Sequence, residues 1–204
     1  MIGLLGKKVG MTQIYSDKGD VIPATILRVG PCFVVQKKTK EKDGYEALQI
    51  GFEKAEDLNK PLAGHFKKNN VTACQELAEI QVANAAEFNL GQEIKVNVFN
   101  PGEKVAVTGL TKGRGFSGGM KRWGWHCGPA SHGSMSHRRP GSAGSGSSPG
   151  RVLRGRHSPG QYGNEQVTIK NLKIAKVDAD NNLLFVKGAV PGSKNGLVMV
   201  KKIK

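Results

Sequence analysis

The sequence has no aspartate or glutamate between Lys104 and Asn164, a stretch of 61 residues. The whole chain of 204 residues contains 16 acidic residues, so about five would fall in a stretch of this length by composition alone. The same stretch holds ten of the 31 lysines and arginines, and therefore ten of the 15 net positive charges. This clustering of charge predicts a polyanionic partner, either a nucleic acid or an anionic membrane surface.

Cysteines are also few, and long hydrophobic runs are absent. Cys32, Cys74 and Cys127 are widely spaced and odd in number, which argues against a disulfide framework or a zinc site built on paired cysteines. No window approaches 18 consecutive apolar residues, and residues 1–8 lack the apolar run of a secretory signal. We therefore expect a soluble intracellular protein with reduced thiols. The lack of any balancing acid among the clustered cations favours nucleic acid as the partner, and no membrane partner is expected.

Outside the acid-free stretch, residues 1–110 and 164–204 have an ordinary globular composition and enough length to bury a core. Short β-branched runs separated by Gly, Asn and Pro turns predict a mainly β fold, specifically a β-barrel. Residues 94–98 and 105–107, joined across Pro101-Gly102, are expected to form a hairpin. Residues 53–92 are more acidic and less regular, which suggests a small α+β insertion. Further strands are expected at residues 21–29, 47–52, 167–169, 183–186 and 197–200.

Residues 111–163 differ in kind from this body. The acid-free stretch that contains them has 15 glycines and nine serines, and its prolines leave no helical or strand period of any length. Low hydrophobicity and high net charge predict that the segment is mobile in isolation and becomes ordered against a partner that neutralises it. Because strands are expected on both sides, we interpret it as a long functional loop rather than a linker between domains.

Three catalytic or metal-binding interpretations of this loop are disfavoured by the surrounding sequence. Residues 113–118 fit the dinucleotide pattern G-x-G-x-x-G, but no helix is expected after them and no acid for a ribose appears before Glu165. Ser117 fits a nucleophile elbow, which needs an acid and then a histidine later in the chain. The last histidine, His157, precedes Glu165, the first acid after Ser117, so this order is not met. Residues 126, 127, 132 and 137 (His, Cys, His, His) match no familiar zinc spacing and are better read as polar contacts to backbone or phosphate. We expect no catalytic residue, metal, cofactor or small-molecule substrate.

The composition of the loop fits RNA. Seven of the eight arginines lie in it, and a guanidinium can hold two phosphate oxygens or stack on a base. Trp123 and Trp125 could stack on unpaired bases, or one of them could anchor the root of the loop to the barrel, and both roles stay open. A DNA-reading helix is not expected, so sequence-specific DNA binding is disfavoured. The candidate RNA-binding residues are Lys112, Arg114, Lys121, Arg122, Trp123, Trp125, His132, His137, Arg138, Arg139, Arg151, Arg154, Arg156 and His157.

Several runs resemble the universal large-subunit ribosomal protein family three, in order and over essentially the whole chain. They include IGLLGKKVGMT at residues 2–12, TKGRGF at 111–116, KRW at 121–123 and VKGAVPG at 186–192. Shorter matches occupy residues 131–133, 136–138, 140–142 and 149–151. The chain length resembles that of bacterial or organellar members.

The resemblance implies a barrel of the translation-factor type and a looped extension that reaches toward the peptidyl transferase region. It also implies direct binding to large-subunit rRNA, early entry into assembly, ribosomal proteins fourteen and nineteen as neighbours, and a cytoplasmic ribosome. Ala106 departs from the family signature, and Ser145 stands where some bacterial members carry a methylated glutamine, so that modification is not expected. A free RNA chaperone with an arginine-glycine arm is the alternative function, and a dehydrogenase is the weaker enzymatic one.

Overall fold

The computed structural model describes residues 3–16 and 18–203. The chain divides into two compact units. One comprises Met1–Thr111 together with Gln166–Lys204, and we refer to it as the body. The other is Lys112–Glu165, which we refer to as the arm. Strands are the main regular structure and form three sheets, so the expectation of a mainly β protein is confirmed.

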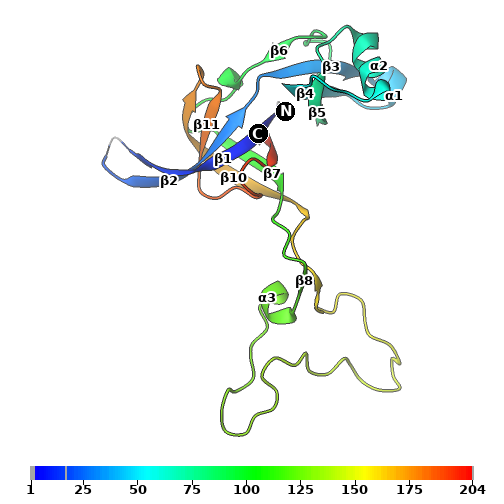
Figure 1. Cartoon of the computed structure of the whole chain (residues 1–204), viewed down its shortest axis with the longest axis vertical. Coiled ribbons are helices and arrows are strands. Elements are labelled where there is room, and N and C mark those ends of the chain that lie inside the picture. The colour runs from blue at the N-terminus through cyan, green and yellow to red at the C-terminus, as the bar shows by residue number, and fades with distance from the viewer. Residues whose placement is uncertain (1–2, 17, 204) are drawn as a thin grey trace. The chain divides into compact units, whose positions relative to one another are not determined.

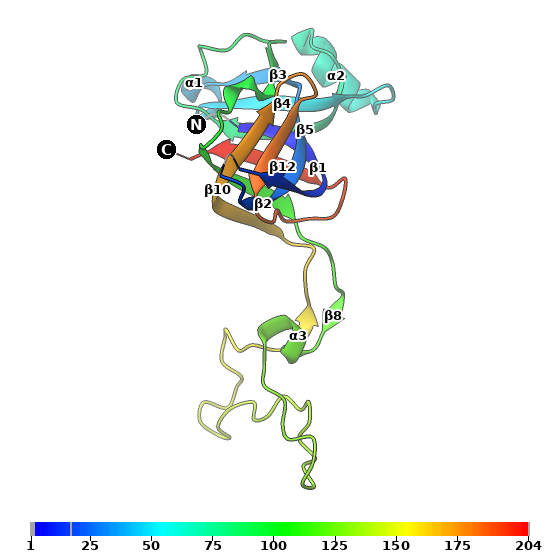
Figure 2. The ribbon, with the colours of Figure 1, turned by 90° about the vertical axis from the view of Figure 1, so that its left-hand side faces the viewer.

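Six strands of the body close into an antiparallel barrel in the order β1-β12-β7-β10-β11-β2 (Figures 1 and 2). Branched residues alternate along these strands and turn one face inward, as in β7, where Val105 and Val107 are buried and Lys104 is exposed. Val107 pairs with Val200 on one side and with Ile169 on the other. The barrel strands are β1 (Gly3–Tyr15), β2 (Val21–Val29), β7 (Lys104–Leu110), β10 (Gln166–Asp178), β11 (Leu183–Lys187) and β12 (Leu197–Lys202).

A second sheet in the body has the strand order β5-β4-β3-β6. Helix α2 packs Phe66 against Val35 of β3 and Cys74 of β5, which forms a small hydrophobic cluster beside the main core. Pro61 lies in the first turn of α2, where its missing N–H costs no helical hydrogen bond. The elements of this part are β3 (Cys32–Lys38), α1 (Lys40–Asp43), β4 (Ala47–Lys54), α2 (Lys60–Asn69), β5 (Cys74–Gln81), β6 (Glu93–Ile94) and the 3-10 turn η1 (Val96–Val98).

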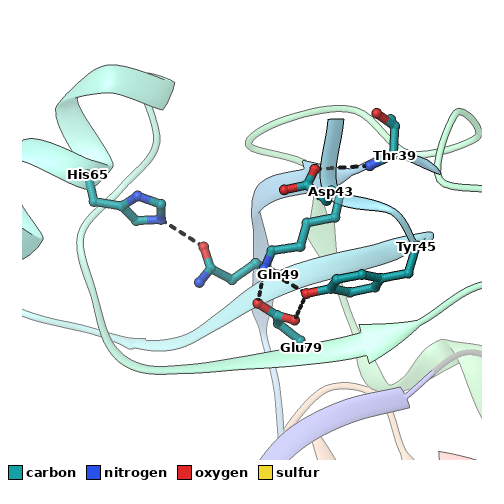
Figure 3. Close-up of polar contacts among 7 residues, drawn as sticks. Thr39, Asp43, Tyr45, Gln49, His65 and Glu79 are labelled. Carbon is teal, nitrogen blue, oxygen red and sulfur yellow. Dashed lines mark hydrogen bonds and ion pairs between the residues drawn. The ribbon is translucent and has the colours of Figure 1, made fainter. Parts of the chain in front are cut away.

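Polar side chains connect the strands on the outer surface of this sheet (Figure 3). The Tyr45 hydroxyl accepts from Lys38 Nζ and donates to Glu79 Oε2, both at 2.8 Å, and Lys38 lies 2.6 Å from the other Glu79 oxygen. The Lys38 ammonium and the Tyr45 hydroxyl hold the pKa of the Glu79 carboxyl below its usual value. His65 of α2 lies 2.7 Å from the Gln49 side chain, which ties the helix to β4.

The strands expected at residues 21–29, 47–52, 167–169, 183–186 and 197–200 are confirmed as parts of β2, β4, β10, β11 and β12. The hairpin expected between residues 94–98 and 105–107 is wrong. β6 ends at Ile94 and pairs with β3, while residues 96–98 form the 3-10 turn. Val96 and Phe99 are both buried, and a 3-10 turn places residues three apart on one side, which an extended strand does not.

Two further differences concern the body. The 13-residue strand β1 was not anticipated, since glycine is depleted in strands and three occur in it. The segment 53–92, expected as an α+β insertion, contains α2 and β5, and β5 is hydrogen-bonded to β4. The sheet to which it contributes therefore begins at Cys32.

Candidate nucleic-acid interface

The two ends of the arm come together in a small folded element, which we call the knuckle and define as residues 114–125 and 157–162. The short strands β8 (Phe116–Ser117) and β9 (Gly160–Gln161) pair there, and helix α3 (Gly119–Trp123) follows β8 (Figures 1 and 2). Arg114 N donates to Tyr162 O at 2.9 Å, and Tyr162 N donates to Gly115 O at 3.0 Å, which extends the pairing beyond β8 and β9. This regular structure differs from the wholly irregular loop that the sequence predicted.

Trp123, at the end of α3, joins the two sides of the knuckle. Its indole ring stacks on the imidazole of His157 with the ring centres 4.1 Å apart and an angle of 4° between the planes. Trp123 Nε1 and Arg122 Nη1 both donate to the carbonyl oxygen of Ser158 at 2.9 Å. The Arg122 guanidinium also lies 5.0 Å from the centre of the Trp123 ring, a cation–π distance. These contacts place one cation and one aromatic ring in fixed positions.

Trp125 packs directly onto the helix backbone at Gly119. A β-carbon added to Gly119 would lie 2.2 Å from a carbon of the Trp125 ring, so this packing requires glycine. On the other side of the knuckle, the guanidinium of Arg114 lies 5.1 Å from the centre of the Tyr162 ring. Both tryptophans thus make contacts within the arm, whereas the anchoring role that the sequence left open joined one of them to the barrel. Base stacking by them stays a prediction.

The remaining part of the arm, residues 126–156, is the distal loop. Residues 124–159, all of which the structure describes, contain no helix or strand. Two segments of the loop contact each other where Gly128 N donates to His137 O at 3.0 Å. A β-carbon on Gly128 would lie 2.4 Å from Ser136 O, so the approach is close. Five other glycines of the loop have open space around them: Gly133, Gly141, Gly144, Gly146 and Gly155.

The candidate residues of the arm are open to solvent. Arg122, Trp125 and Arg156 are half-buried, and the other eleven are exposed. The arm carries nine lysines and arginines and one acid, Glu165 at its end, so its formal charge is strongly positive. In the body, cations are paired with carboxylates in Lys7–Glu53, Arg28–Glu53, Lys38–Glu79, Lys40–Glu46 and Lys202–Glu103.

Sequence reasoning did not single out three members of the knuckle. Ser158 supplies a carbonyl oxygen, and backbone acceptors carry no sequence signal. The Tyr162 ring makes a cation–π contact with the Arg114 guanidinium. The position of Tyr162 among glycines could have suggested an aromatic contact. Phe116 is 80% exposed although it lies in a strand. Its exposure depends on the pairing of β8 with β9, which sequence spacing does not reveal.

Comparison with known proteins identifies the family. A family model described as ribosomal protein L3 matches residues 60–182. The large ribosomal subunit protein uL3 of Pelotomaculum thermopropionicum is 57% identical over 202 residues, which cover 98% of this chain and 96% of the relative. The uL3 proteins of Thermosipho africanus and Thermotoga petrophila are 54% and 53% identical over 201 residues, with 98% of this chain and 98% and 97% of the relatives covered. The chain belongs to the ribosomal protein L3 family.

Proteins of the L3 family are structural constituents of the large ribosomal subunit, so this chain is a ribosomal protein and not an enzyme. The geometry of the knuckle agrees with that conclusion. The glycine pattern at residues 113–118 leads into a helix of five residues, too short for the dinucleotide fold. Ser117 is 4% exposed and its hydroxyl donates to Arg114 O at 3.4 Å, so it is not presented as a nucleophile.

Three other features of this L3-family chain concern metal ligands, membrane-spanning helices and thiol chemistry. No three histidine, cysteine, aspartate or glutamate side chains gather at one point in residues 3–16 and 18–203. In the same residues, no helix has the length and apolar character needed to cross a membrane. Burial raises the pKa of the Cys32 thiol to about 12, which keeps this cysteine protonated and inert near neutral pH.

Proposed function

We propose that the chain binds large-subunit rRNA directly through the arm. The observation that carries this proposal is the charge of the arm: nine exposed or half-buried lysines and arginines with a single acid. Phosphate is the partner that such a set of cations neutralises, and release of its counterions supplies much of the binding free energy. All fourteen candidate residues, from Lys112 to His157, belong to this proposed surface.

The two parts of the arm would contribute differently. The knuckle holds Arg122 and Trp123 in fixed positions, which suits a defined crevice of a folded RNA. The distal loop has glycines with open space around them, so its backbone can approach an RNA surface closely and follow its shape. Such binding reads shape and phosphate positions rather than base edges in a groove.

The family membership motivates finer proposals. The body includes a barrel of the translation-factor type that docks on the large subunit, and the loop predicted at residues 111–163, which makes up most of the arm, extends toward the peptidyl transferase region. The chain enters assembly early, contacts ribosomal proteins fourteen and nineteen, and works in cytoplasmic ribosomes of the bacterial kind. Ser145 leaves no glutamine for methylation at that position.

A salt titration tests direct rRNA binding by the arm. We expect replacement of Arg151, Arg154 and Arg156 by glutamine to lower the log-log slope of affinity against salt by about 2, since each phosphate contact to irregular RNA contributes roughly 0.7. The measurement is filter binding of the full chain to deproteinised large-subunit rRNA at several salt concentrations. The matched control replaces Lys60, Lys67 and Lys68, three exposed cations of α2, by glutamine. Equal slopes for the two triple variants would contradict the proposal.

The alternative is a free RNA chaperone that uses the same basic arm away from ribosomes. Its supporting observation is the distal loop, which has few internal contacts and resembles a flexible arginine-glycine segment. Sedimentation of a cell lysate through a sucrose gradient separates the two functions. Stoichiometric, salt-resistant presence in large subunits supports the ribosomal role, whereas slowly sedimenting protein supports the chaperone.

A further inference from the structure

Phe116 is an exposed aromatic side chain on an ordered element of the arm. Its exposed fraction is 80%, against 42% for Trp123 in the same knuckle. Large apolar side chains usually lie inside a protein, so one that a folded strand presents to solvent requires a reason.

The backbone holds Phe116 in this outward position. Phe116 pairs with Gln161 and Ser117 pairs with Gly160, and successive side chains of a strand point to opposite faces. Ser117 is the inward one, at 4% exposure, with its hydroxyl on Arg114 O. Turning Phe116 inward would require a shift of one residue in the pairing, which would expose Ser117 and break the bonds that extend from β8 and β9. The strand pair therefore presents the ring to a partner.

The surroundings of Phe116 leave room for that partner. Gly115 and Gly118, on either side of β8, have no atom within 4 Å of the position that a β-carbon would take. Bulky side chains at these positions would screen the ring, and glycine leaves its approaches open. Arg114, two residues before Phe116, supplies a cation beside the ring.

Charge decides which partner fits. The arm has nine basic residues and one acid, so the groups around Phe116 attract a polyanion and would repel the basic surfaces of most RNA-binding proteins. Every base presents a π-face to an aromatic ring, and an aromatic side chain next to cations is the usual platform for unpaired bases. The two tryptophans of the knuckle are less available, since Trp123 stacks on His157 and Trp125 packs on Gly119.

We propose that Phe116 stacks on an unpaired base of large-subunit rRNA and is the base-contacting residue of the knuckle. This inference rests on the proposed binding of rRNA by the arm. Phosphate contacts by Arg114 and Arg122 hold the RNA backbone, and the ring of Phe116 receives one base that the RNA fold leaves unstacked. Stacking is tolerant of sequence, so the base is defined by its position and not by its identity.

The test uses the full chain and deproteinised large-subunit rRNA. We expect Phe116→Ala to weaken binding by roughly 5- to 150-fold, the range that corresponds to loss of one base-stacking contact. Phe116→Trp should bind like the unmodified chain, and Phe116→Leu, which keeps an apolar side chain without a π-face, should lose most of the affinity. Tyr15→Ala is the matched control and should bind like the unmodified chain, since Tyr15 is an aromatic side chain of the body that is 70% exposed. Circular dichroism establishes that each variant is folded.

Ultraviolet crosslinking of large subunits, followed by mass spectrometry, gives a second reading. We expect a nucleotide attached at Phe116. Unchanged binding by Phe116→Ala, full affinity of Phe116→Leu, or a crosslink from Phe116 to a protein would each overturn the stacking role. A failure of this inference alone leaves the arginine variants with reduced salt dependence, whereas a failure of the proposed function removes that effect as well.

Discussion

At the scale of single residues, glycine has different roles at two positions of the same strand. Gly6 of β1 faces its partner strand so closely that a β-carbon would lie 2.5 Å from Arg28 O and 3.0 Å from Val29 Cα. Gly10, four residues along β1, has no atom within 4 Å of the same position. Both are paired with β2, and Gly6 is also paired with Val198 of β12, whereas Gly10 follows a shift in the register of β1 against β2. The close contact at Gly6 is with backbone, which cannot move aside like a flexible side chain.

We therefore expect Gly6→Ala to destabilise the body by about 1–3 kcal/mol, the usual cost of inserting a group into packed structure. Gly10→Ala should be neutral or slightly stabilising, because alanine loses less backbone entropy than glycine on folding. Chemical denaturation of the two variants measures both effects. A Gly6→Ala variant as stable as Gly10→Ala would show that the close approach of β1 and β2 is not required.

At the scale of elements, helix α3 depends on its surroundings. Five residues are too few for a helix to be stable in water, and α3 contains one buried residue, Gly119. Tertiary contacts stabilise the helix. The Trp125 ring packs on Gly119, and Arg122 and Trp123 donate hydrogen bonds to Ser158 O. The knuckle is thus a cooperative unit in which ring packing and helix formation support each other.

Gly119→Ala should separate Trp125 from α3 and loosen the knuckle, since the new methyl group would occupy the space of the indole ring. We expect amide exchange in residues 119–125 to accelerate by about tenfold or more, which corresponds to a loss of roughly 1.4 kcal/mol of local stability. Hydrogen exchange with mass spectrometry measures this change. Gly118→Ala is the control, because Gly118 has open space around it. Equal exchange in the two variants would contradict a packing role for Trp125.

At the scale of the whole molecule, the two units have different sources of order. Both hydrophobic clusters consist of body residues, so burial of apolar surface stabilises the body. The arm has the knuckle contacts and, in the distal loop, a few turns. Stability of the body and function of the arm should therefore be separable.

Replacement of residues 128–156 by a short Gly-Ser linker should leave the thermal unfolding of the body unchanged within about 0.5 kcal/mol, the usual limit for changes away from packed groups. The same variant should fail to accumulate in large subunits, because it loses five arginines and two histidines of the proposed RNA surface. Calorimetry and sucrose-gradient sedimentation measure the two outcomes. Normal accumulation of the shortened chain in mature subunits would show that the distal loop is dispensable.

Particular residues show where sequence reasoning succeeded and where it did not. Val105 and Val107 alternate with polar neighbours and proved to be a strand, since period-two patterning survives in any sheet that has one buried face. Residues 94–98 have the same pattern, but Val96 and Phe99 both enter the core and the chain turns between them. The pattern records which side chains are buried and not which strand is the partner. In the arm, the cations were visible in the sequence, and the contacts of Trp123 with His157 and Ser158 were not, because they join residues about 35 positions apart.

The sequence by itself determined the charge of the arm, its inability to build a hydrophobic core and the β character of the body, because these follow from composition and short-range periodicity. Only the tertiary structure decided that six strands close on one another, that Trp123 is held against His157, and that Phe116 faces outward. Those outcomes depend on pairing between segments that are distant along the chain. The free energy of such pairing depends on both segments together, so the local sequence of either one does not predict it.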